Sequence, residues 1–181
     1  MLPRIDGRLR VMASEAGHAD FAARTPEEWA LAEFVAAREG RVQVEHVLSG
    51  PGLRRLHAFT HQSLACRAGI DATTPEASAQ VSAAALSGAC DGCVEALAIF
   101  VRALGAEAGN LALRSTATAG LFVGGGIAPR ILPALQTGRF LDAFLDKAPM
   151  ESLVARVPVR VIVNEDAGLL GAAVAAAALV T

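Results

Sequence analysis

Side chains able to hold a polar ligand gather near the start of the sequence. The segment Ser14-Glu15-Ala16-Gly17-His18-Ala19-Asp20-Phe21 contains two carboxylates, one imidazole and a turn of small residues. Carboxylates accept hydrogen bonds, and an imidazole can donate or accept them. The segment therefore predicts a polar binding site on a loop that leaves a strand.

A second candidate site is the triglycine Gly124-Gly125-Gly126, which follows the apolar run Leu121–Val123. The order predicts a buried strand, a glycine turn and a helix that opens near Pro129. Such a turn lets a ligand approach the backbone and directs the N–H groups of a helix start at it. A tight packing turn explains the glycines equally well. No G-K-[ST] follows, so this is not a Walker A loop.

The three cysteines form no disulfide framework, because their number is odd. Cys90-Asp91-Gly92-Cys93 is formally a C-x-x-C, but zinc needs two more ligands and no second motif of suitable chemistry follows. His57 and His61 lie four residues apart, without the acid of H-E-x-x-H or a third ligand. We expect inert cysteines at a helix start, a solvated helix face for the two histidines, and no bound metal. Redox or metal use of the cysteines is the alternative.

Composition narrows the class of protein. A chain of 181 residues can bury one hydrophobic core. Its net charge of −2 gives no sign of the basic surface that binds nucleic acid or an anionic membrane. The longest apolar segment, 168–180, is shorter than the roughly 18 residues of a membrane span. We expect a cytoplasmic protein that ends in a buried helix.

The remaining patterns predict a mostly helical scaffold. A hairpin is expected over 5–13, with Asp6-Gly7 as its turn. Helix starts are expected at Thr25 and Thr74 from their capping residues and prolines. Another helix is expected after Ser49-Gly50-Pro51-Gly52, which breaks one short element and starts the next. A long helix should begin near Cys93 and be interrupted by glycines at 105 and 109.

The C-terminal third predicts short helices at 140–147 and 150–154, a second apolar strand at 157–163 and a closing helix. Strand, glycine turn, helices, strand and helix together indicate an α/β fold with a parallel pair of strands.

Four segments, taken in order, resemble successive blocks of the bacterial glucokinase family. They are Ser14–Ala22, Glu45 with Val47–Leu53, Leu121–Arg130 and Ala167–Gly171. The resemblance implies the hexokinase/actin-like ATPase fold, with a mixed sheet and packed helices from an actin-like/ribonuclease-H-like ATPase domain. It also implies that residues 1–181 form a single domain similar to the C-terminal, large domain of glucokinase.

The resemblance assigns roles to particular residues. Glu15, His18 and Glu45 match the family's sugar ligands, and Gly124, Gly125 and Gly126 match its adenosine-side turn. It implies glucose as acceptor, ATP with Mg as phosphoryl donor in the full-length enzyme, and a homodimer. A surface loop with a capping role is the alternative for Glu15 and His18.

The sequence also departs from the family pattern. Kinases of this fold use a D-x-G-G-T hairpin, a second phosphate loop and an aspartate that accepts the sugar proton. Asp6-Gly7 lacks the following Gly-Thr, and no Asn-Asp pair occurs. We therefore expect no catalytic residue in this chain, which resembles a C-terminal fragment without the small domain and inactive alone.

Two other interpretations stay open. The chain could be a non-catalytic sugar-binding or dimerisation module derived from a sugar kinase. Other sugar kinases and kinase-derived repressors share E-x-G-H, but they typically carry C-x-C-G-x-x-G-C downstream. Here no cysteine occurs between His18 and Cys66, which argues against that group.

Overall fold

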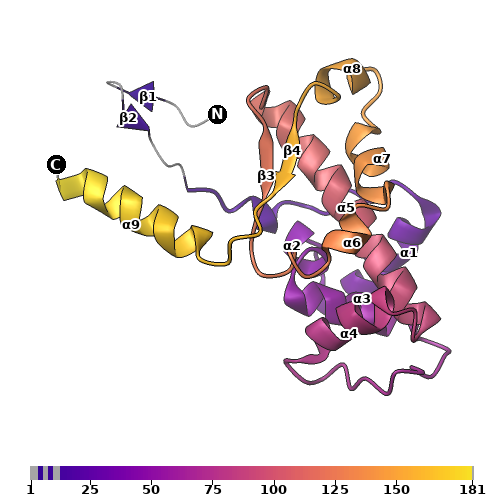
Figure 1. The fold of residues 1–181 in the computed structure, drawn as a ribbon. Coiled ribbons are helices and arrows are strands. Elements are labelled where there is room, and N and C mark those ends of the chain that lie inside the picture. Colours follow the sequence, from indigo (N-terminus) through magenta and orange to yellow (C-terminus); the bar gives the residue numbers. More distant parts are fainter. Residues whose placement is uncertain (1–3, 6–7, 10–12, 181) are drawn as a thin grey trace.

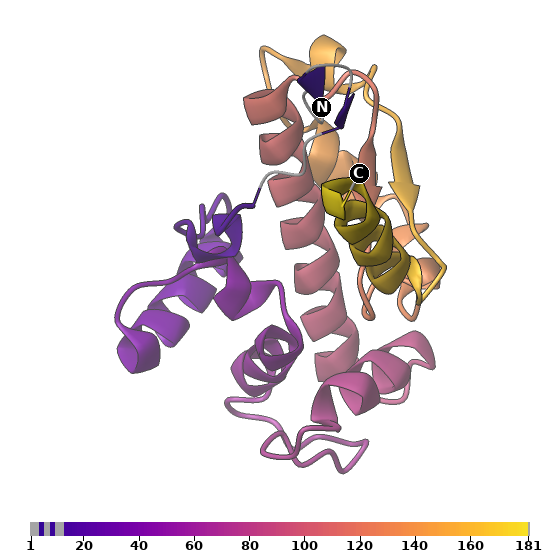
Figure 2. The same cartoon turned by 90° about the vertical axis from the view of Figure 1, so that its left-hand side faces the viewer.

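The central element is helix α5 (Asp91–Ser115). A computed structural model describes residues 4–5, 8–9 and 13–180, with side chains for 13–178. Helices α3 (Gly50–Thr60) and α4 (Ala77–Leu86) pack against one part of α5, and α7 (Arg139–Leu145) packs against another. Figures 1 and 2 show α5 running through the body of the molecule between these groups.

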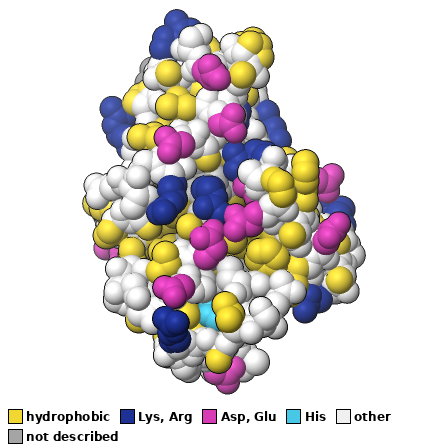
Figure 3. Space-filling model, turned by 90° about the vertical axis from the view of Figure 1, so that its right-hand side faces the viewer, with side chains coloured by type: hydrophobic (Ala, Val, Ile, Leu, Met, Phe, Trp, Pro, Cys, Tyr) yellow, Lys and Arg dark blue, Asp and Glu magenta, His cyan; other side chains and the backbone are white. Residues whose placement is uncertain are grey.

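Helix α5 is apolar because it forms the core. Its buried side chains include Leu97, Ile99, Phe100 and Val101. Among the described residues it is the one helix long and apolar enough to cross a membrane, but 67% of its apolar window is buried within the fold. On the face in Figure 3, acidic and basic side chains are intermixed rather than gathered by sign.

The expected interruption of this helix at Gly105 and Gly109 is wrong. The helix is continuous, and both glycines face α7. A Cβ at Gly105 would lie 2.2 Å from the carbonyl oxygen of Phe140, and one at Gly109 would lie 2.6 Å from that of Phe144. The glycines therefore allow two helices to approach closely.

Local signals placed two helix starts correctly. Helix α1 (Pro26–Glu39) begins after Thr25, whose hydroxyl accepts from the N–H of Glu28, and α3 begins after Ser49, whose hydroxyl accepts from Gly52. The cap expected at Thr74 is wrong. Its hydroxyl donates to the carbonyl of Asp71, and α4 begins only at Ala77.

Two short strand pairs are present in the described ranges. Strands β1 (Arg4–Ile5) and β2 (Arg8–Leu9) are antiparallel, which confirms the hairpin, while its expected turn lies outside the described residues. Strands β3 (Leu121–Val123) and β4 (Val159–Val161) are parallel. The fold is thus mostly helical with a small parallel sheet.

The other expected helices of the C-terminal third are present, with one difference in burial. Helices α6 (Leu132–Leu135), α7 and α8 (Glu151–Val154) lie between the two parallel strands in sequence. The closing helix α9 (Ala167–Val180) extends away from the body (Figure 1). The expected burial of this helix is wrong, because Leu169 is 74% and Val174 71% exposed.

Candidate functional site

Backbone hydrogen bonds join the acidic segment near residue 15 to helix α2 (Val44–Val47). The N–H of Phe21 donates to the carbonyl of Val42 at 3.0 Å, and the N–H of Val44 donates to the carbonyl of Ala19 at 2.9 Å. The result is a small antiparallel bridge that carries the 3-10 turn η1 (Ala16–His18) beside α2.

Arg41 reinforces this junction. Its Nη1 atom donates to Oδ1 of Asp20 at 2.7 Å and to the carbonyl oxygen of His18 at 3.0 Å. Gln43 is the N-cap of α2, in a capping box with His46. The two segments are therefore held together by backbone and side-chain contacts.

The junction brings the three predicted sugar ligands together. Nε2 of His18 lies 3.8 Å from Oε2 of Glu15, and Nδ1 lies 3.8 Å from Oε2 of Glu45. All three side chains are open to solvent, with exposed fractions of 55% for His18, 90% for Glu15 and 55% for Glu45. One imidazole thus lies between two carboxylates on an accessible surface.

Two neighbours shape this group. The Nδ1 atom of His18 lies 2.6 Å from Oε1 of Gln43. Because an amide oxygen only accepts, Nδ1 carries the proton in this contact, and Nε2 faces Glu15. A Cβ at Gly17 would meet Oε2 of Glu45 at 3.6 Å, so glycine leaves that face of the carboxylate uncovered.

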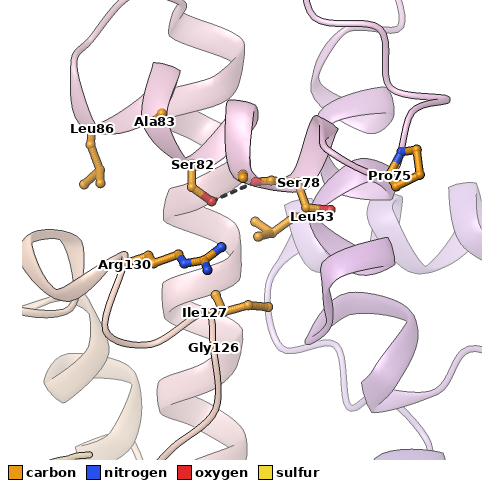
Figure 4. Close-up of a pocket in the computed structure, with 10 residues that line it drawn as sticks. Leu53, Pro75, Ser78, Ser82, Ala83, Leu86, Gly126, Ile127 and Arg130 are labelled. Atoms are coloured by element: carbon orange, nitrogen blue, oxygen red, sulfur yellow. Dashed lines mark hydrogen bonds between the residues drawn. The ribbon is translucent and has the colours of Figure 1, made fainter. Parts of the chain in front are cut away.

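The predicted glycine turn borders a cavity. Strand β3 ends at Val123, Gly125 has a φ of +96°, and Gly126 lines a space of about 440 Å³ between this turn and α4 (Figure 4). The helix expected to open near Pro129 begins slightly later, as α6 at Leu132, and turns lie between the glycines and this helix.

The other side chains around the cavity were not found from the sequence. They include Leu53, Pro75, Ser78, Ser82, Ile127 and Arg130. In Figure 4 the Arg130 guanidinium extends toward Ser82, whose hydroxyl donates to the carbonyl of Ser78 at 2.9 Å. Two serines four residues apart on α4 share one helix face, and that spacing was the available signal.

The expectation of a solvated face for His57 and His61 is wrong. His57 is only 5% exposed, and His61 is half-buried against Cys90. Cys66, which follows the same helix, lies near both cysteines of the C-x-x-C, and the sequence alone did not reveal this proximity.

Comparison with known proteins places this geometry in a family. A family model described as Glucokinase matches residues 1–179. The chain is 40% identical over 194 residues to a glucokinase from Synechocystis sp.. The aligned region covers 98% of this chain and 55% of that protein. It is also 40% identical over 164 residues to a glucokinase from Aromatoleum aromaticum, over 91% of this chain and 48% of that protein.

Solved structures of two glucokinases also match the fold of this chain. A crystal structure of glucokinase from an Antarctic psychrotroph matches with a TM-score of 0.80 and 33% identity, over 95% of this chain and 52% of that one. A glucokinase from Balamuthia mandrillaris, solved in complex with glucose, shares the fold at a TM-score of 0.70 and 19% identity, over 86% of this chain and 44% of that one. The chain spans about half the length of the curated relatives it matches. Because the family match extends over nearly every residue, this chain belongs to the glucokinase family.

Proposed function

We propose that this chain supplies the hexose-binding and adenosine-binding parts of a glucokinase, which transfers a phosphoryl group from ATP to glucose in the cytoplasm. The observation that carries the proposal is the His18 imidazole placed between the carboxylates of Glu15 and Glu45. A hexose presents neighbouring hydroxyl groups, and each carboxylate can accept hydrogen bonds from two of them.

This arrangement can select a sugar by its hydroxyl pattern. With Nδ1 of His18 donating to Gln43, Nε2 is free to accept from a hydroxyl on the side of Glu15. A sugar that lacks one hydroxyl would leave a carboxylate oxygen without its partner, and that unpaired group is the usual source of discrimination. Glu15, His18 and Glu45 act here as binding groups rather than as an acid–base pair.

The cavity beside Gly126 fits the adenosine part of ATP. Its volume of about 440 Å³ lies within the usual range for small-molecule sites, roughly 300–1,000 Å³. Among the described residues, no atom lies within 4 Å of where a Cβ of Gly126 would stand, so the backbone there is open to a ligand. ATP supplies the phosphoryl group, and Mg neutralises charge on its phosphates when bound.

We further propose that this chain alone binds sugar without transferring phosphate. In support, its sequence offers no match to the phosphate hairpin, the second phosphate loop or the sugar-activating aspartate. The exposed apolar side chains of α9 favour a second candidate function, a sugar-binding module that pairs with another copy of itself.

Calorimetric titration with glucose tests the proposal. We expect measurable binding by the purified chain, weakened about 10- to 100-fold by Glu15→Gln and by Glu45→Gln, because each removes a charged acceptor. Glu33→Gln changes an exposed carboxylate on α1 and should leave binding unaltered. Identical heats for all four proteins would contradict the proposed site.

A further inference from the structure

Five side chains of metal-ligating type meet where α3 packs on the start of α5. His57 lies on α3, His61 is the C-cap of this helix, Cys66 follows in a loop, and Cys90 and Cys93 lie at the start of α5. Four of these residues, His57, His61, Cys66 and Cys93, each offer a donor atom within 4.8 Å of the others. Three segments far apart in the sequence therefore contribute to one cluster, which is separate from the sugar site.

The spacings suit a tetrahedral ion. The sulfur of Cys66 lies 3.9 Å from that of Cys90 and 4.0 Å from that of Cys93. Nε2 of His61 lies 3.2 Å from the sulfur of Cys90. Donors placed about 2.0–2.3 Å from a tetrahedral zinc ion are about 3.3–3.8 Å from one another. The cluster thus needs only small side-chain shifts to hold zinc, and all three cysteines are free thiols.

His61 already has the orientation of a ligand. Its Nδ1 atom lies 2.8 Å from the carbonyl oxygen of His57. A carbonyl only accepts, so Nδ1 donates, and the other nitrogen, Nε2, lies 3.2 Å from the sulfur of Cys90. Metal-binding histidines are commonly fixed by this kind of second hydrogen bond. A metal bound at Nε2 would displace the proton that lies between Nε2 and the Cys90 sulfur, because metal binding releases protons.

His57 supplies an independent observation. Its ring is 5% exposed, and neither nitrogen has a hydrogen-bond partner among the described residues. The ring stacks on that of His61 with centroids 4.0 Å apart. Buried polar groups are normally paired, so an unpaired imidazole with three other donor atoms within 4.8 Å indicates a ligand.

The surroundings maintain this geometry. A Cβ at Gly92 would lie 2.5 Å from Cε1 of His61, so glycine is needed for the ring to lie against α5. The hydroxyl of Thr60 donates to the carbonyl of Gly92 at 2.9 Å and ties the two helices together.

We propose that this chain binds one structural zinc ion through His57, His61, Cys66 and Cys93, with the thiol of Cys90 adjoining the ion. The ion would join the loop after α3 to the start of α5 and so hold the two helices in register. This proposal does not depend on the sugar site, because glucose binding and zinc content are measured separately.

Elemental analysis of the full chain, purified from zinc-supplemented medium, tests the proposal. We expect about one zinc per chain, and an affinity lowered at least about 100-fold by Cys66→Ser or Cys93→Ser, since changes outside the ligand shell alone cost about 10- to 100-fold. Cys90→Ser should lower the zinc affinity less than these two changes, because Cys90 adjoins the ion without binding it. His46→Gln, on α2, is the matched control and should keep its zinc.

A second measurement covers variants that fail to fold. In the unaltered chain, zinc should protect Cys66 and Cys93 from alkylation, as read by mass spectrometry, and a chelator should remove the protection and lower the melting temperature. Zinc content near zero, equal zinc in all variants, or complete loss in Cys90→Ser with retention in Cys93→Ser would overturn the proposal. A disulfide formed in place of metal binding would also overturn it.

Discussion

The Nδ1 atom of His18 lies 2.6 Å from Oε1 of Gln43, a residue that also caps helix α2. Gln43 therefore orients the imidazole and, through the cap, the helix that carries Glu45. One side chain outside the predicted ligand set controls the geometry of two residues within it.

Replacing Gln43 should weaken sugar binding without removing a ligand. We expect Gln43→Ala to raise the dissociation constant for glucose about 10-fold, the loss of roughly one strong hydrogen bond. Gln43→Glu keeps an acceptor oxygen and should stay within about 3-fold of the unaltered chain. The measurement is calorimetric titration, with Gln62→Ala on the surface as control. Equal binding by Gln43→Ala and the control would show that the imidazole needs no such support.

The isolated chain should show no glucose-dependent turnover of ATP. Phosphoryl transfer depends on positioned phosphate loops and on a residue that accepts the sugar proton, and the sequence contains no match to them. Formation of glucose 6-phosphate, followed with a coupled dehydrogenase, is the readout. A rate near that of ordinary kinases, about 1 per second or more, would contradict the proposal that this chain alone binds sugar without transferring phosphate.

The carboxylate of Glu28 forms a buried ion pair that fixes the start of α1. Its exposed fraction is 1%, and it accepts from Nη2 of Arg24 at 2.7 Å, from Nε at 3.2 Å and from the backbone N–H of Arg24 at 2.8 Å. We expect Glu28→Ala to lower the free energy of unfolding by about 3 kcal/mol, because it leaves a partly buried guanidinium with only the Asp146 carboxylate, 3.8 Å away. Urea unfolding measures this.

The exposed Glu33 on the same helix gives the matched control for that experiment. Glu33→Ala should change stability by no more than about 0.5 kcal/mol. A similar loss in both variants would mean that the ion pair contributes no more than a surface charge.

Local signals in the sequence were sufficient for much of this fold. Thr25 and Ser49 cap helices because a hydroxyl before a proline-containing first turn satisfies free N–H groups, whatever lies elsewhere in the chain. The parallel pairing of β3 with β4 follows from two apolar runs separated by helices. The grouping of Glu15, His18 and Glu45 came from resemblance to a family, since they lie on separate segments.

Features that depend on tertiary contacts were beyond the sequence. Nothing local distinguishes a glycine that ends a helix from one that admits a neighbouring backbone, as Gly105 does. The histidine–cysteine cluster could not be read from the residues after Cys93, because His57, His61 and Cys66 all precede the C-x-x-C. An H-x-x-x-H upstream of a C-x-x-C was the available signal. Whether the side chains of α9 are exposed depends on which other segment packs against this helix, and the residues of α9 alone do not show that.

The contact between α5 and α7 should not tolerate a side chain at Gly105. Gly105→Ala places a Cβ 2.2 Å from the carbonyl oxygen of Phe140. The overpacking should cost about 1–3 kcal/mol, which exceeds the gain of up to about 1 kcal/mol from alanine in a helix. Thermal unfolding should therefore give a lower melting temperature than for the unaltered chain.

Gly171 on α9 provides the control for Gly105. No atom of the described residues lies within 4 Å of where its Cβ would stand, so Gly171→Ala should leave the melting temperature unchanged or raise it slightly. If Gly105→Ala behaved in the same way, the two helices would have to be less tightly packed than their glycines indicate.

The exposed side chains of α9 should make the isolated chain self-associate. Leu169, Leu170 and Val174 are 74%, 55% and 71% exposed on one terminal helix. Apolar side chains gathered in this way are usually covered by a partner, because their contact with water is unfavourable. We expect the mass from size-exclusion chromatography with light scattering to rise with concentration, and Leu169→Lys with Val174→Glu to lower it toward the monomer. Leu111→Lys changes a single exposed leucine of α5 and should not lower it. A monomer mass for the unaltered chain at every concentration would contradict this expectation and leave α9 without a role in pairing.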